Sequence, residues 1–237
     1  ATCFELQREL MTTKGTNEAI INRFWSQSQS DFLKIAIIEN YHSSLSEAFI
    51  KRILSEGSLM VRQVLAVNIP KVPMGLKSEF ESLLDDVSYV TKENALYKLW
   101  IYFPEDRSLY LDKTKDYIGL PNKNVRLLWL TLAMITKDYQ TENKATFYAE
   151  LSGYTASKYS IETRQGAFQY LSDTVGMSNQ NLLDLVNACL HHSWQFKKFA
   201  RDLLEQLLQR EDYKKRINGL KGKLNTEELR YINSKTI

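Results

Sequence analysis

One amphipathic sequence motif, which we call a phrase, recurs six times along the chain. This repetition restricts the possible folds more than any other feature. Aligned on a basic residue, successive phrases are separated by 28, 30, 34, 38 and 33 residues. Repeats of this length are typical of architectures in which each unit packs only on its neighbours. The six aligned residues are Lys34, Arg62, Lys92, Arg126, Arg164 and Lys197.

Each phrase is predicted to be one helix with a single buried stripe. Small or apolar residues dominate three and seven positions after the basic residue, which is the spacing of one helix face. The +3 residues are Ile37, Leu65, Ala95, Trp129, Ala167 and Ala200, and the +7 residues are Tyr41, Ile69, Leu99, Ala133, Leu171 and Leu204. The residue before the basic one, such as Leu33 or Val61, belongs to the same stripe.

A second helical pattern lies between the phrases, so two helices recur every 28 to 38 residues. The sequence therefore predicts an all-α fold: an α-solenoid or superhelix of antiparallel helix pairs, of the HEAT or armadillo kind. We expect a single domain over 1–237, with helix pairs at 16–41, 44–69, 73–103, 105–137, 141–175 and 179–210, and a closing cap at 211–237.

Turn and cap residues are placed as such a fold requires. Only 9 Gly and 4 Pro are present, too few for the frequent turns of an all-β fold. Gly57 and Gly119 are predicted to be left-handed helix caps. The predicted N-caps are Ser44, Ser46, Asp106, Thr141 and Asn179, and the prolines expected between helices are Pro70, Pro73, Pro104 and Pro121.

The repeated cation is interpreted as architecture. In a two-helix repeat it could hydrogen-bond a carboxylate or carbonyl of a neighbouring repeat while its stem lies on apolar surface. Exchange between Arg and Lys at this position argues against a fixed bidentate ligand site, because the two side chains are not interchangeable there.

No pattern in the chain indicates catalysis, a metal or a cofactor. The only histidines are His42, His191 and His192, and adjacent helical residues such as the last two point about 100° apart. Cys3 and Cys189 form neither a disulfide framework nor a metal site, and we interpret Cys189 as a small buried hydrophobe. We therefore expect no catalytic, metal-binding or cofactor-binding residue in this chain, and no substrate-binding residue can be assigned from the sequence.

Charge gives a weak indication of partners. The net charge is +3, but the segment from Lys197 to Ile237 holds 11 basic and 6 acidic residues. Acidic residues interrupt this segment, which favours a solvated helix face over nucleic-acid binding. The aromatic stretch ALYKLWIYF (95–103) is likewise interpreted as core and not as a stacking platform.

The chain contains no apolar run long enough for a transmembrane span and no signal peptide. It opens on Ala1, directly inside apparent structure, which we interpret as a fragment or a processed chain. We expect a soluble protein and leave its compartment open, cytoplasmic or exported, because any export signal would precede Ala1.

Three phrases resemble a known family: DDVSYVTKENALYKLWIYFPEDRSLYLDKTKDYIG, NKNVRLLWLTLAMIT and SIETRQGAFQYLSD. They are similar to the C-terminal HEAT-like helical domain of gluzincin zinc aminopeptidases, the family of aminopeptidase N, in its bacterial members. The resemblance implies a non-catalytic domain that covers the active-site cleft and gates peptide access. It places zinc in a separate catalytic domain upstream of Ala1, which would be the main partner of this chain, with the peptide substrate contacted indirectly. The family's His-Glu-x-x-His and Gly-x-Met-Glu-Asn motifs have no counterpart here, so no catalytic residue is carried over.

Two other functions stay open. A stand-alone HEAT-type scaffold would bind a partner protein on its concave face and should show a continuous charged or aromatic groove. A peptidase lid should instead show an apolar patch near residues 1–60. Nucleic-acid binding through the basic C-terminal end is the weakest alternative and would show steep salt dependence.

Overall fold

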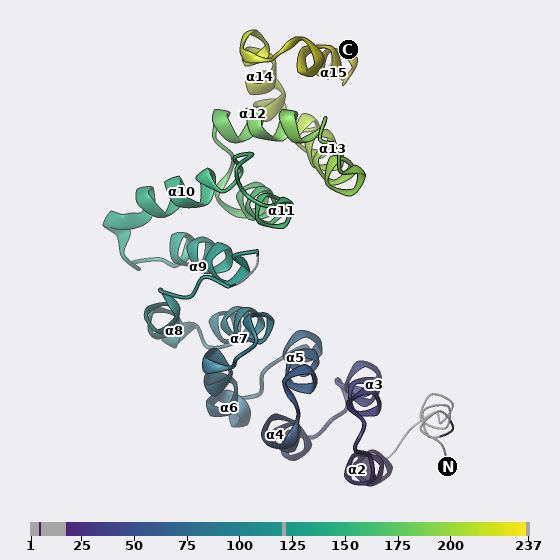
Figure 1. Ribbon diagram of the computed structural model, residues 1–237. Coiled ribbons are helices and arrows are strands. Elements are labelled where there is room, and N and C mark those ends of the chain that lie inside the picture. Colours follow the sequence, from purple (N-terminus) through teal and green to yellow (C-terminus); the bar gives the residue numbers. More distant parts are fainter. Residues whose placement is uncertain (1–4, 6–17, 120–121, 236–237) are drawn as a thin grey trace. The chain divides into compact units, whose positions relative to one another are not determined.

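The computed structural model describes residues 5, 18–119 and 122–235 (Figure 1). These residues form helices joined by turns, without any strand, so the all-α prediction is confirmed for the described part of the chain. Internal contacts divide the chain into two compact units, Ala1–Lys115 and Asp116–Ile237. The single domain expected from the sequence stays a prediction.

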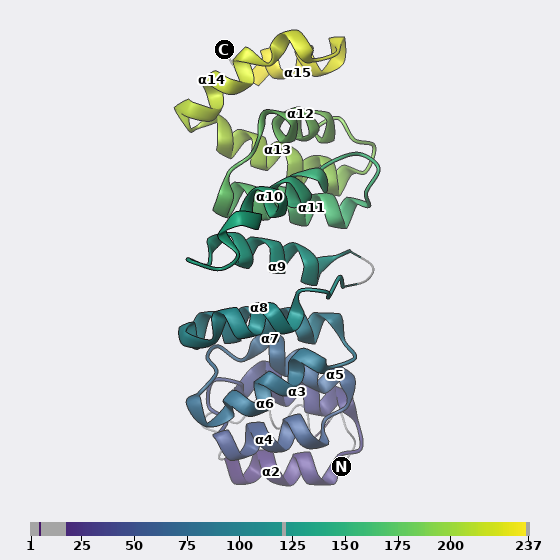
Figure 2. The same ribbon diagram turned by 90° about the vertical axis from the view of Figure 1, so that its left-hand side faces the viewer.

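The helices of unit 1 lie in two rows. Figures 1 and 2 show α2, α4 and α6 following one another in one row, with α3, α5 and α7 beside them in the other. Within the second row, α3 packs on α5 and α5 packs on α7. The elements are α2 (Glu18–Gln27), α3 (Asp31–Tyr41), α4 (Glu47–Glu56), α5 (Leu59–Asn68), η1 (Met74–Leu76), α6 (Lys77–Ser82), η2 (Leu83–Asp85), α7 (Tyr89–Tyr102), η3 (Pro104–Asp106) and α8 (Arg107–Thr114).

Unit 2 alternates in the same way: α9 packs on α11, and α11 packs on α13. Helices α14 and α15 lie against α12 near the end of the chain. The elements are α9 (Asn124–Ile135), η4 (Thr141–Asn143), α10 (Lys144–Gly153), α11 (Ile161–Tyr170), the π-helical turn η5 (Leu171–Val175), α12 (Asn179–Ala188), α13 (Trp194–Leu208), α14 (Glu211–Gly219), η6 (Lys221–Lys223) and α15 (Thr226–Lys235). Helices α8 and α9, expected to pair over 105–137, belong to different units.

The predicted buried stripe is confirmed almost throughout. Every +3 residue is buried, and so is every +7 residue except Tyr41, which is half-buried. The residue before the basic one is also buried in all six phrases. The helix phase read from the sequence is therefore correct, and each phrase helix presents this stripe to the core of its unit.

The N-cap predictions were confirmed only at Ser46, whose hydroxyl accepts a hydrogen bond from the Phe49 amide at 3.2 Å. Helix α12 begins one residue earlier than predicted, so its cap is Ser178 and not Asn179. Asp106 precedes α8 but makes no side-chain cap bond. Ser44 lies in the turn after α3, and Thr141 starts a 3₁₀ turn, so neither caps an α-helix.

The prediction of a left-handed cap was wrong at Gly57, which is extended with φ −70°. Gly57 is required for space instead, because a Cβ there would lie 2.5 Å from the Ile53 carbonyl oxygen. Gly119 does adopt a positive φ of 79°, although it lies beyond Thr114, the last residue of α8.

The prolines lie at helix boundaries, as expected. Pro70 and Pro73 lie between α5 and η1, and Pro104 begins η3, where a missing N–H is tolerated. Pro121 falls outside the described residues.

Candidate functional site

Two of the six repeated cations, Arg62 and Arg126, make the hydrogen bond to a neighbouring repeat that the architectural interpretation predicts. Arg62 Nε donates to Asp86 Oδ2 at 2.7 Å, and Arg62 Nη1 donates to the Gly57 carbonyl at 2.8 Å. Arg126 Nε and Nη2 donate to the two carboxylate oxygens of Glu150, at 2.8 and 2.6 Å. The contact between Arg126 and Glu150 is bidentate. Exchange between Arg and Lys at this position of the repeat therefore did not exclude a bidentate contact in one of the repeats.

Arg164 is the most deeply buried of the six, with 3% of its surface exposed. Its Nε donates to the Thr155 carbonyl at 2.9 Å, and its guanidinium lies 4.9 Å from the Phe196 ring centroid. Burial lowers the pKa of this guanidinium. The arrangement fixes the loop after α10 against α11 and α13, so Arg164 has a structural role.

The three lysines differ from one another. Lys34 Nζ lies 5.0 Å from the Trp25 ring centroid, and Lys92 Nζ lies 5.4 Å from that of Tyr89. Lys197 has no side-chain hydrogen bond, ion pair or ring contact within the described part of the chain, and it lines a hollow in unit 2. It is therefore the repeated cation for which the fold supplies no structural role.

Residues considered for chemistry have structural partners. His191 and His192 stack with ring centroids 4.1 Å apart, and His191 Nδ1 accepts a hydrogen bond from the Ser193 amide. Burial raises the pKa of the Cys189 thiol to about 12, which keeps it protonated at neutral pH. Across residues 5, 18–119 and 122–235, no group of three His, Cys, Asp or Glu side chains is placed to hold a metal ion.

The exposed large apolar side chains gather in unit 1. In unit 2 they are limited, among described residues, to Ile118, Ile135 and Trp194. In unit 1 they are Ile20, Phe32, Leu59, Met60, Val67, Met74, Val87, Val90, Tyr97, Ile101 and Leu109. Scattered exposed apolar residues are normal, but a contiguous group indicates an interaction surface.

Five of these residues occupy equivalent positions on neighbouring helices. Phe32, Met60 and Val90 lie two residues before the basic residue of α3, α5 and α7, and Val67 and Tyr97 lie five residues after it. Because −2 and +5 are seven residues apart, they share one outward helix face. We call these five residues the apolar face.

Few charges interrupt this surface. Positions −2, +1, +2 and +5 of the three helices comprise twelve residues, of which only Glu39 and Glu93 are charged. Phe32 is 60% exposed and Met60 is 58% exposed, so these two side chains project well into solvent. A surface of this kind favours a partner with apolar groups of its own.

Sequence reasoning missed the apolar face because it assigned aromatic stripes to the core. That assignment was wrong for Tyr97, which is exposed, although Leu96, Leu99 and Phe103 of the same stretch are buried. The sequence pattern that could have predicted the apolar face is at position −2, which is apolar in the first three phrases. In the last three phrases the same position is polar: Asn124, Glu162 and Gln195.

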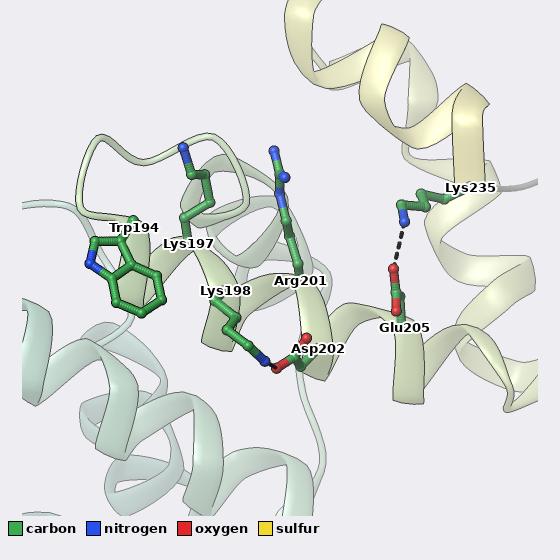
Figure 3. Close-up of a pocket in the computed structure, with 7 residues that line it drawn as sticks. All are labelled: Trp194, Lys197, Lys198, Arg201, Asp202, Glu205 and Lys235. Carbon is green, nitrogen blue, oxygen red and sulfur yellow. Dashed lines mark hydrogen bonds and ion pairs between the residues drawn. The ribbon is translucent and has the colours of Figure 1, made fainter.

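A second candidate lies in unit 2, where α13 and the end of α15 border a hollow of about 440 Å³ (Figure 3). Its lining residues are Trp194, Lys197, Lys198, Arg201, Asp202, Glu205 and Lys235. Lys198 pairs with Asp202 at 2.6 Å, and Lys235 pairs with Glu205 at 2.5 Å. The four cations and two carboxylates leave the hollow with a net positive charge.

No protein-family model, curated protein or solved structure matches this chain. The resemblance to zinc aminopeptidases is therefore an expectation from the sequence alone. Among the described residues, no helix is both long and apolar enough to cross a membrane.

Proposed function

We propose that this chain is a non-catalytic domain of HEAT-like helix pairs that docks on a protein through its apolar face. Following the sequence resemblance, we propose that the docked protein is the catalytic domain of a zinc aminopeptidase in the same polypeptide. The chain would cover the active-site cleft and restrict which peptides enter. The observation that carries the docking proposal is that exposed apolar side chains occupy equivalent positions on the neighbouring helices α3, α5 and α7.

Burial of the apolar face in an interface would supply free energy for docking. Fully burying one Val, Leu, Phe or Met side chain contributes roughly 1.5–3 kcal/mol. Phe32 and Met60 keep more than half of their surface exposed in this chain, so much of that free energy is still available to an interface. The entropy lost on association opposes it, and a domain joined to its partner in one polypeptide loses less of that entropy.

The location of the face supports a lid. A domain that closes on an upstream catalytic domain is expected to carry an apolar patch near residues 1–60. Two residues of the apolar face, Phe32 and Met60, lie within that range. The face continues to Tyr97 on α7, which is further than expected and is the observation that also supports a stand-alone scaffold.

The coding sequence upstream of the Ala1 codon distinguishes the two functions. A continuous reading frame that encodes His-Glu-x-x-His, followed by a Glu about twenty residues later, is expected for the lid. A start codon immediately upstream would refute the lid and leave the scaffold. In that case the partner would be a separate protein, and Met60→Asp would be expected to abolish its binding.

The pure chain is expected to show no aminopeptidase activity, with or without added zinc. The described residues offer no cluster of metal ligands, and the zinc-binding motif is absent from the sequence. The measurement is hydrolysis of a chromogenic aminoacyl substrate. Turnover that a chelator abolishes, and that zinc restores, would contradict the proposal.

A further inference from the structure

The hollow on α13 brings an exposed indole, Trp194, together with two cations, Lys197 and Arg201, that form no ion pair within the described residues. Trp194 is 66% exposed and makes no stacking contact with any ring of the described chain. Lys197 follows it one helical turn later, and Arg201 follows Lys197 by another turn. Residues at this spacing lie along one stripe of the helix.

The two ion pairs of the hollow do not use this stripe. In Figure 3, Lys198 turns toward Asp202, and Lys235 on α15 faces Glu205. Lys197 and Arg201 extend together from the same side of α13. The charges that remain uncompensated are therefore two neighbouring cations, one helical turn apart.

Arg201 is held in place for binding. Its Nε donates to the Cys189 carbonyl at 2.9 Å, and its guanidinium lies 5.0 Å from the Tyr231 ring centroid. These contacts fix the plane of the guanidinium, and the described residues supply no hydrogen-bond partner for its two terminal nitrogens. A fixed guanidinium beside a mobile ammonium is a suitable pair for a phosphate group.

The first turn of α13 adds to the positive potential. Ser193 precedes the helix but makes no side-chain cap bond, so the amides of the first turn lack that partner. The helix dipole places partial positive charge at this end, beside Trp194. A volume of about 440 Å³ lies within the usual range for small-ligand sites.

We propose that this hollow binds a nucleoside phosphate, either free or at the end of a single-stranded nucleic acid. The base stacks on Trp194, and the phosphate lies between Lys197 and Arg201. Indole stacking tolerates any base, and the two cations recognise charge and not sequence, so the site discriminates little among bases. The acidic residues between 197 and 237 favoured a solvated helix face over nucleic-acid binding, whereas the grouping of these side chains supports a phosphate ligand. The site lies in unit 2, and its test is independent of the docking proposal for unit 1.

The test is isothermal titration calorimetry of the whole chain at low salt with three probes: ADP, a 5′-phosphorylated single-stranded oligonucleotide, and inorganic phosphate. ADP or the oligonucleotide is expected to bind more tightly than phosphate. Trp194→Ala should weaken nucleotide binding about tenfold, because it removes the stacking of the base on the indole, and should leave phosphate binding unchanged. Lys197→Gln should weaken the binding of all three probes.

Lys214→Gln is the matched control, because it removes one exposed cation of α14 outside the hollow and should change no affinity. Tighter binding of the oligonucleotide than of ADP would identify a single strand as the ligand, and equal affinity would identify a free nucleotide. Absence of binding would overturn the proposal. A nucleotide affinity that Trp194→Ala leaves unchanged, or that Lys214→Gln lowers as much as Lys197→Gln does, would also overturn it.

Discussion

The bidentate pair between Arg126 on α9 and Glu150 on α10 offers the sharpest test of the architectural role of the repeated cation. The two N–O distances are 2.8 and 2.6 Å, and the guanidinium also lies 4.7 Å from the Trp129 ring centroid. Glu150 accepts a further hydrogen bond from the Tyr154 hydroxyl at 2.9 Å. The side chains of the pair are 20% and 32% exposed, so water screens them only in part.

The expected magnitude follows from this geometry. An exposed ion pair contributes about 0.2–1 kcal/mol, whereas a hydrogen bond to a charged group contributes about 1.5–3 kcal/mol. Arg126→Met keeps an apolar side chain against Trp129 but leaves the Glu150 carboxylate with only the hydrogen bond from the Tyr154 hydroxyl among the described residues. We expect it to lower the free energy of unfolding by about 2 kcal/mol, with a coupling energy to Glu150→Gln of about 1.5 kcal/mol.

The effect should depend on pH in a defined direction. The hydrogen bond from Arg126 lowers the pKa of Glu150 below its ordinary value of 4.5. The stabilisation is therefore fully present above that ordinary value and is lost as the pH falls through the folded-state pKa. Arg126→Met should consequently lower the free energy of unfolding by less at pH 3 than at pH 7.

The assay is urea unfolding followed by circular dichroism for the parent, both single variants and the double variant. The control cycle uses Lys198 and Asp202, an i,i+4 pair whose side chains are 64% and 53% exposed, for which we expect a coupling energy below about 0.5 kcal/mol. A coupling energy for Arg126 and Glu150 no larger than that of the control pair would refute the structural role.

Two further predictions concern the core and a buried lysine. Leu99→Asp and Ala167→Asp should each abolish the cooperative unfolding transition of their unit, because both side chains are fully buried. The control Tyr97→Asp, at an exposed position, should keep the parental melting temperature. If Leu99→Asp or Ala167→Asp melts like the parent, the assigned helix phase is wrong. Lys98 Nζ donates to the carbonyls of Ala66 and Val67, and burial lowers its pKa from 10.5 to about 8. Between these two pKa values the unfolded chain binds more protons than the folded chain, so the stability of the parent rises with pH. From pH 7 to pH 10 the free energy of unfolding of the parent should increase by about 2 kcal/mol relative to that of Lys98→Met, allowing for partial screening by solvent. If urea unfolding shows the same difference between the two proteins at both pH values, the prediction is contradicted.

Periodicity predicted the helices and their buried stripes because both depend on local geometry. The +3 and +7 positions must face the core once a helix forms, and all of them except Tyr41 are buried. Cap positions were harder to predict, because several adjacent polar residues can each cap a helix. At α12, Ser178 caps instead of Asn179 because the hydroxyl of Ser178 and the side chain of Asn181 form a reciprocal capping box.

The candidate sites could not be predicted, because they depend on which side chains remain without partners after packing. Tyr97 and Leu99 are both apolar residues of one helix, and the neighbouring helices cover only Leu99. Arg164 and Lys197 occupy the same position in the repeat, yet Arg164 bonds the Thr155 carbonyl and Lys197 lines a hollow. Such differences arise from tertiary contacts between residues that are distant in sequence.

The measurement that tests the central claim most directly is the alkylation rate of a thiol placed in the apolar face. With Cys3 replaced by Ser, the natural Cys189 is buried and its pKa is about 12, so a Met60→Cys thiol would dominate the reaction. Gln206→Cys, an exposed position of α13, serves as the control. In the isolated chain both thiols should react fast. In the polypeptide translated from the entire reading frame, the account predicts strong protection at Met60→Cys and none at Gln206→Cys. Equal reactivity of Met60→Cys in the two proteins would contradict it.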